Sequence, residues 1–211
     1  MAIGLFGGTF DPIHVGHLRV AEEIRQDFSL ERIYFIPSGV PPHKRGRAIT
    51  DADERLRMVK AALKGNKFFR ISQVEAIRQG PSYTIDTLQH FGKRFRELYF
   101  LIGIDAFSEI KTWHLYKELF HHAHFIVMTR PMATRKAPLA ELPRYLKKDV
   151  KKVGETVFEH ASGKNIYFHD ITQMDISSTK IKELLKRRRS IRYLVPASVE
   201  RIIIERGLYR T

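Results

Sequence analysis

The stretch GGTFDPIHVGH, residues Gly7–His17, follows a short apolar run at Ile3–Phe6 and leads into a segment with helical periodicity. The apolar run is typical of a buried first strand, which two successive glycines end. From Val15 to Phe28, apolar side chains recur every three or four residues, which predicts a helix with one apolar face. The order strand, glycine-containing loop, helix begins an α/β sheet and places the loop where such sheets bind ligands.

The same alternation continues along the chain. Further strands are predicted at 33–36, 68–72, 98–102, 124–129 and 166–168. Helices are predicted at 51–63, 82–95, 113–120, 177–187 and 197–205, with a short one near 139–150 in the lysine-rich segment 132–164. Connections of this length require a mostly parallel sheet with helices on both faces. The sequence predicts a single α/β domain over 1–211, Rossmann-like and doubly wound, with a small helical C-terminal part at 176–211.

The composition is that of a folded protein and is compatible with a reducing compartment such as the cytosol. The 211 residues are 43% hydrophobic, above the level of disordered chains, and they include no cysteine, which excludes disulfides and cysteine-based zinc sites. No apolar stretch reaches the roughly 18 residues of a membrane span. The segment Met1–Phe6 carries no basic leader of a secretory signal. We expect a cytoplasmic protein with no membrane partner.

The charge balance indicates an anionic ligand. The chain has 37 Lys and Arg against 23 Asp and Glu, a net charge of +14. Such an excess attracts polyanions of several classes: nucleotides, nucleic acids and acidic membrane surfaces. A nucleic-acid-binding module is the alternative from another class, but no stacked-aromatic RNA motif or helix-turn-helix signature supports it. The charge alone does not say which of these binds. We expect no nucleic-acid partner, and the oligomeric state stays open, with a homo-oligomer as one alternative.

The first loop has the chemistry of a phosphate site. Gly7 and Gly8 let backbone N–H groups approach a phosphate closely and tolerate positive φ angles. The helix that begins near Val15 points its unsatisfied N–H groups at the loop. His14 and His17 can project toward one ligand, and Gly16 between them removes a side chain where a nucleotide could lie. The alternative is a glycine turn with two ordinary histidines; the stretch is neither a Walker A loop nor a GxGxxG fingerprint.

Other candidates each have a structural alternative. Trp113 is the only tryptophan and offers a flat platform for an aromatic ring, or else it is a core aromatic beside Leu119 and Phe120. Asp105, after Gly103, suits a ribose hydroxyl, or caps a helix.

Charged and capping residues leave similar alternatives. Lys44 and Arg130 are phosphate contacts or solvated surface charges. The stretch ISSTKIK, residues Ile176–Lys182, opens a helix at Ser177, where capping and phosphate binding can coexist. His121, His122 and His124 do not share a helix face, so no metal site is expected there.

The two end stretches together resemble the nucleotidyltransferase superfamily that carries an H-x-G-H motif. Gly7–His17 matches its first hallmark, and Ile176–Lys182 is similar to its I-S-S-T-x-I-R signature. The middle stretch SYTIDTL at Ser82–Leu88, with Gly103-x-Asp105 and Trp113, resembles the bacterial nicotinate-mononucleotide adenylyltransferases. The resemblance covers nearly the whole chain. The runner-up is another adenylyl or cytidylyl transferase, such as the phosphopantetheine enzyme, which usually has Ser where Thr9 stands and is shorter.

The resemblance implies that the 5′-phosphate of nicotinate mononucleotide attacks the α-phosphate of ATP in line, giving deamido-NAD and pyrophosphate in NAD biosynthesis. Mg²⁺ would arrive with ATP, and no protein metal site is implied. Lys182 stands where the family usually has Arg, so the charge is kept but the planar fork is lost.

The resemblance also implies roles for individual residues. Catalysis would fall to His14, His17 and Lys182. Trp113 would stack on the nicotinate ring while backbone N–H groups at Thr84 and His114 hold its carboxylate. The implied ATP-binding residues are Gly7, Gly8, Thr9, Phe10, Gly16, Gly103, Asp105, Ser177, Ser178 and Thr179. The implied nicotinate-mononucleotide-binding residues are Lys44, Thr84, Trp113, His114 and Arg130.

Overall fold

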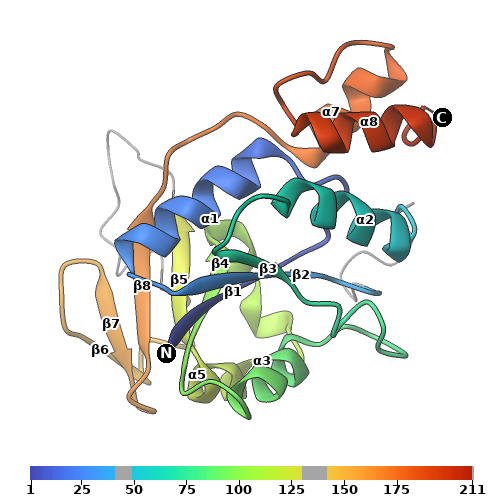
Figure 1. The fold of residues 1–211 in the computed structure, drawn as a ribbon. Coiled ribbons are helices and arrows are strands. Elements are labelled where there is room, and N and C mark those ends of the chain that lie inside the picture. The colour runs from blue at the N-terminus through green and yellow to red at the C-terminus, as the bar shows by residue number, and fades with distance from the viewer. Residues whose placement is uncertain (41–48, 130–141, 211) are drawn as a thin grey trace.

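A computed structural model describes residues 1–40, 49–129 and 142–210 of the chain (Figure 1). Two predicted phosphate contacts, Lys44 and Arg130, lie outside these described residues. Within the described part, no helix is long and apolar enough to cross a membrane.

The described strands form one sheet of eight in the order β3-β2-β1-β4-β5-β8-β7-β6. The parallel part consists of β1 (Ala2–Gly8), β2 (Arg32–Pro37), β3 (Phe69–Ile71), β4 (Glu97–Gly103), β5 (His124–Thr129) and β8 (Asn165–Asp170). At one edge β7 (Val157–His160) pairs antiparallel with β8, and β6 (Val150–Lys152) pairs antiparallel with β7. The mostly parallel sheet confirms the predicted fold class.

Helices cover both faces of the sheet (Figure 1). One face carries α1 (Val15–Asp27) and α2 (Ala52–Leu63), with α7 (Ser178–Lys186) and α8 (Ala197–Glu205) beyond them. The other face carries α3 (Thr84–Gly92), α4 (Ile104–Ser108), the 3₁₀ turn η2 (Ile110–Thr112) and α5 (Tyr116–His122). Each face has its own apolar core, because successive strand side chains point to opposite faces. In β5, Phe125 and Val127 belong to the α3–α5 core, and Ile126 belongs to the α1–α2 core.

The strand order reverses at β1. From β1 the chain proceeds to β2 and β3 on one side, and then returns to place β4 on the other side. The segments that follow β1 and β4 therefore leave toward opposite faces of the sheet, and this is the point where open α/β sheets bind ligands.

The helix predicted near 139–150 is wrong over the residues that the structure describes. Residues 142–149 form turns, Val150–Lys152 is strand β6, and the strand β7 was not predicted at all. Strands of 3 and 4 residues carry too few alternations for the pattern to show.

Two predicted helices begin later than their patterns indicate. The helix predicted from Trp113 begins at Tyr116, because Leu115 adopts a left-handed conformation with φ of 50°. The helix predicted from Ser82 begins at Thr84, and Ser82 is not its cap, since the Ser82 Oγ accepts a hydrogen bond from the Gly39 N–H at 2.9 Å. In both cases the early residues are released from the helix and line a cavity instead.

Candidate active site

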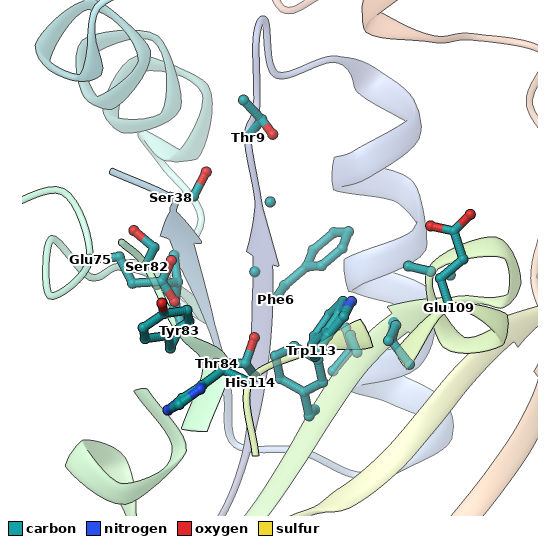
Figure 2. A pocket seen from close by; sticks show the side chains of 18 residues that line it. Phe6, Thr9, Ser38, Glu75, Ser82, Tyr83, Thr84, Glu109, Trp113 and His114 are labelled. Atoms are coloured by element: carbon teal, nitrogen blue, oxygen red, sulfur yellow. The ribbon is translucent and has the colours of Figure 1, made fainter. Parts of the chain in front are cut away.

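A cavity of about 370 Å³ opens at the switch point between β1 and β4 (Figure 2). In Figure 2, Glu75, Ser82 and Tyr83 lie on one side, Trp113 and Glu109 lie on the other, and Phe6 lies between them. The lining residues are Phe6, Gly7, Gly8, Thr9, Ile36, Ser38, Glu75, Ser82, Tyr83, Thr84, Phe100, Leu101, Ile102, Gly103, Ala106, Glu109, Trp113 and His114. Most of this wall is apolar or glycine, which suits a flat ring with few polar groups.

Trp113 and His114, consecutive in the chain, both line this first cavity. Trp113 follows η2 and is partly buried, with its ring edge-on to Phe100 at 6.2 Å between centroids and 85° between planes. His114 packs on Tyr83 at 4.3 Å and 30°. The alternative that placed Trp113 on a helix face with Leu119 and Phe120 is therefore wrong, because α5 begins at Tyr116. Trp113 still packs against the apolar core from the cavity side.

Thr84 opens helix α3 at the same cavity. Its N-cap, Tyr83, makes no capping hydrogen bond with its side chain. The first backbone N–H groups of a helix have no partner within the helix and carry its positive end. Thr84 thus brings hydrogen-bond donors to the wall of the cavity, as the resemblance implied for a carboxylate.

Glu75 is a buried carboxyl group in this cavity that was not predicted. It is 8% exposed, and the Thr87 hydroxyl donates to it at 2.7 Å. Burial raises the pKa of Glu75, with the Thr87 hydrogen bond opposing the shift. No local pattern marks it, since it lies in an irregular segment between β3 and α3.

A second cavity of about 190 Å³ lies at the start of α1. Phe6 lines both cavities, so the two cavities are neighbours. The remaining lining residues are His14, Gly16, His17, Val20, Met128, Ile171, Thr172, Gln173, Met174 and Ile176. The segment before α7 thus faces the first loop, as the pairing of the two end stretches predicted.

His14 and His17 meet at this second cavity with stacked rings, 3.6 Å apart and 23° between planes. The His14 backbone N–H donates to Nδ1 of His17 at 3.2 Å. A neutral His17 ring therefore carries its proton on Nε2, which makes that nitrogen a donor. Burial lowers the pKa of His14 to about 4, so His14 is neutral near pH 7. Its buried Nδ1 has no hydrogen-bond partner among the described residues.

The glycines act through close packing here. A Cβ on Gly16 would meet the His14 ring at 3.1 Å, and a Cβ on Gly8 would meet the Phe10 ring at 3.0 Å. Both contacts are tighter than side chains usually make, so glycine lets these rings lie against the backbone. Gly7 and Gly8 do not use their tolerance of positive φ, because both pair with β2 as strand residues; in this loop the positive φ of 48° falls on Phe10.

Helix α7 contacts the first loop directly. The Ser177 Oγ accepts from the Lys180 N–H at 3.1 Å, which confirms its predicted capping role. The Ser178 hydroxyl donates to the Pro12 carbonyl at 2.9 Å, across 166 residues of chain. Thr179 is exposed on the first turn of the helix. The two hallmark stretches, Gly7–His17 and Ile176–Lys182, are therefore in direct contact.

Lys182 pairs with Asp11 of the first loop. The Lys182 ammonium contacts Oδ2 of Asp11, which is 5% exposed. Burial would raise the pKa of Asp11, but hydrogen bonds from Lys182 and Tyr209 outweigh it, and the pKa is lowered. Asp11 is therefore an anion that holds Lys182, and a weak base.

Arg55 of α2 joins the loops around the site. It is 1% exposed, and its guanidinium donates to four backbone carbonyls. The acceptors are Thr9 at 2.9 Å, Ser38 at 2.6 Å, Gly39 at 3.0 Å and Thr50 at 2.8 Å. One side chain thus fixes the ends of β1 and β2 relative to α2.

The structure contradicts one of the two roles predicted for Asp105, helix capping. Gly103 is the N-cap of α4, and Asp105 is an exposed residue of the first turn, so the capping alternative is wrong. Gly103 lines the first cavity, whereas Asp105 lines neither of the two cavities. Contact between Asp105 and a ribose hydroxyl stays a prediction.

Comparison with known proteins agrees with this geometry. Residues 5–184 match the cytidylyltransferase-like family. A protein of Desulfatibacillum aliphaticivorans described as a probable nicotinate-nucleotide adenylyltransferase is 42% identical over 217 residues, covering 99% of this chain and 100% of the relative. One of Trichlorobacter lovleyi with the same description is 42% identical over 212 residues, covering 100% of both chains.

A solved structure shows the same fold. The nicotinic acid mononucleotide adenylyltransferase of Plasmodium falciparum, complexed with NaAD, superimposes with a TM-score of 0.71 at 19% identity, covering 99% of this chain and 97% of the other.

The chain belongs to the cytidylyltransferase-like family of nucleotide-transferring enzymes and, within it, to the nicotinate-nucleotide adenylyltransferases.

Proposed function

We propose that the enzyme joins the AMP part of ATP to nicotinate mononucleotide, forming deamido-NAD and pyrophosphate in NAD biosynthesis. The observation that carries the proposal is the pair of cavities that share Phe6 at the sheet switch point. The indole of Trp113 lines the first cavity, and the stacked rings of His14 and His17 line the second cavity at the start of α1. Two nucleotides placed there would bring their phosphates together at the first loop.

Nicotinate mononucleotide is assigned to the first cavity. Its pyridine ring would lie against Trp113, because an indole face is a good platform for a flat ring. Its carboxylate would accept hydrogen bonds from backbone N–H groups at Thr84, where α3 begins, and at His114.

ATP is assigned to the second cavity and the first loop. The adenine would lie between α1 and the segment before α7, and the phosphates would run along Gly7–Phe10 toward His14 and His17. Gly16 brings the ligand close to the backbone of α1. The first turn of α7 at Ser177–Thr179 supplies further N–H groups. The ribose would lie near Gly103, with Asp105 as its acceptor.

The chemistry then needs positioning and charge stabilisation, because the attacking phosphate oxygen is already an anion. It forms a bond to the α-phosphorus of ATP as the bond to the bridging oxygen of pyrophosphate breaks. The Nε2–H of His17 would donate to the phosphate oxygens, and neutral His14 would lie beside it. Lys182 and Ser178 would stabilise the leaving pyrophosphate.

Mg²⁺ would enter as part of the ATP substrate. No cluster of three or more His, Asp or Glu side chains in the described residues could hold a metal ion. Mg²⁺ binds readily through phosphates and retained water, with few protein ligands. In the proposed MgATP complex, phosphates and water would supply the metal ligands.

The remaining expectations complete the proposal. Both substrates are small dissolved molecules, so we place the reaction in the cytoplasm with neither nucleic acid nor membrane as partner.

Replacement of Trp113 by alanine tests the placement of the nicotinate ring. The KM for nicotinate mononucleotide is expected to rise about 5- to 150-fold, the effect of losing one stacking surface. The KM for ATP should stay within about twofold, since Trp113 lines only the first of the two cavities. Steady-state kinetics with each substrate varied in turn measures both values.

The Trp113→Phe variant is the matched control, because it keeps an aromatic face toward the ring. It should recover most of the loss. A rise confined to the KM for ATP would place the nicotinate ring elsewhere.

A further inference from the structure

Tyr209, near the end of the described chain, reaches the first loop. Its hydroxyl donates to Oδ1 of Asp11 at 2.6 Å, and the other oxygen of that carboxylate contacts Lys182. The Lys182 ammonium also lies 5.1 Å from the centre of the Tyr209 ring. Side chains from the first loop, from α7 and from the segment after α8 thus meet at one point.

The backbone after α8 is bent to bring Tyr209 there. Gly207 has φ of 61°, and Tyr209 itself has φ of 64°, a conformation that side-chain-bearing residues rarely adopt. The Leu208 N–H donates to the Ile203 carbonyl at 3.0 Å, which turns the chain back at the end of the helix. Ile203 and Val199 anchor α8 in the core beside α2. Disfavoured backbone conformations that are maintained by surrounding packing cluster at functional sites.

The contacts give Tyr209 a definite effect on Asp11. A carboxylate has two oxygens, and Tyr209 occupies one of them, which fixes the rotation of the group and directs the other at Lys182. A lysine side chain has four flexible methylene groups and a single ammonium, so its place depends on what holds its end. An arginine could grip both oxygens with its planar fork and would depend less on a third group.

We propose that Tyr209 is a positioning residue for adenylyl transfer, which holds the Lys182 ammonium over the first loop through Asp11 and through its own ring. This proposal rests on the proposed function. It makes the C-terminal segment part of the active site.

The same contacts predict a change in pH dependence. The groups that face Asp11 are Lys182 from α7, Tyr209, the Thr50 backbone N–H at 3.5 Å and the Arg55 guanidinium from α2. Loss of the Tyr209 hydroxyl removes one hydrogen bond that lowers the pKa of Asp11, so that pKa rises. Since Asp11 holds Lys182 only as an anion, the fall in activity on acidification should then begin at a higher pH.

The Tyr209→Phe variant tests this, because it keeps the ring and removes the hydroxyl. We expect kcat to fall about tenfold, the effect of one hydrogen bond to a charged group. The KM for nicotinate mononucleotide should stay unchanged, and the acid limb of the kcat profile should move to higher pH. The matched control is Tyr193→Phe, since Tyr193 also has a positive φ, of 67°, but is 85% exposed. It should behave as the wild type.

A second variant separates positioning from a merely structural role. In the Lys182→Arg background, the Tyr209→Phe change should cost less in kcat than it does with lysine present. An unchanged kcat and acid limb in Tyr209→Phe, or an equal loss in both backgrounds, would overturn the proposal. Absence of dinucleotide synthesis by the wild type would instead refute the proposed function, and the Tyr209 proposal with it.

Discussion

Alanine in place of His17 is expected to lower kcat about 100- to 1000-fold, the usual effect of removing one donor to a charged transition state. The His14 N–H donates to Nδ1 of His17, so a neutral His17 ring carries its proton on Nε2, the nitrogen assigned here to the phosphates. KM values should change far less than kcat, because the donor matters most as charge shifts toward pyrophosphate. Steady-state kinetics measures both quantities.

The variant should fold normally. The changed residue is partly exposed, and the lost capping contact at the start of α1 costs about 1 kcal/mol. The control is His90→Ala, an exposed histidine in the last turn of α3, which should leave kcat unchanged. Normal turnover in the His17 variant would remove the histidine pair from the mechanism.

Methionine in place of Arg55 is expected to lower the free energy of unfolding by about 3 kcal/mol. Methionine fills much of the space, but the carbonyls of Thr9, Ser38, Gly39 and Thr50 lose their donor. The effect stays below a simple sum of four hydrogen bonds, because burial of the guanidinium itself carries a cost. Urea denaturation followed by circular dichroism measures it.

Arg57→Met is the matched control on the same helix. Arg57 is 52% exposed and pairs with Glu54 at 3.6 Å, so its loss should change the unfolding free energy by less than about 0.5 kcal/mol. Equal stability of the two variants would show that the Arg55 hydrogen bonds are not what joins these loops.

Long elements with clear periodicity were predictable from the sequence. The strand His124–Thr129 and the helix Ala197–Glu205 have the predicted bounds, and Ser177 caps α7 as expected. Each has enough apolar positions, or a specific capping residue, to define it locally. The meeting of His14 and His17 was also predictable, because it depends on spacing within one turn of helix.

Contacts that depend on the tertiary fold were not predictable in this way. The hydrogen bond between Tyr209 and Asp11 spans 198 residues, and neither residue carries a local sign of it. Trp113 left its predicted helix because Leu115 takes a left-handed conformation, which depends on the surrounding packing.

Arg55 is a different case, because it did leave a signal. It lies three and four residues before Met58 and Val59, so that a charged residue occupies the apolar face of α2. A buried charge at such a position requires polar partners, and here those partners are the loops of the site.

The most direct test of the account is pyrophosphate release from MgATP with a panel of phosphorylated acceptors and with RNA. We expect release with nicotinate mononucleotide, accompanied by equal amounts of deamido-NAD, and little release with 4′-phosphopantetheine or RNA. Comparable release with 4′-phosphopantetheine, or none with nicotinate mononucleotide, would contradict the assignment of the two cavities beside Phe6.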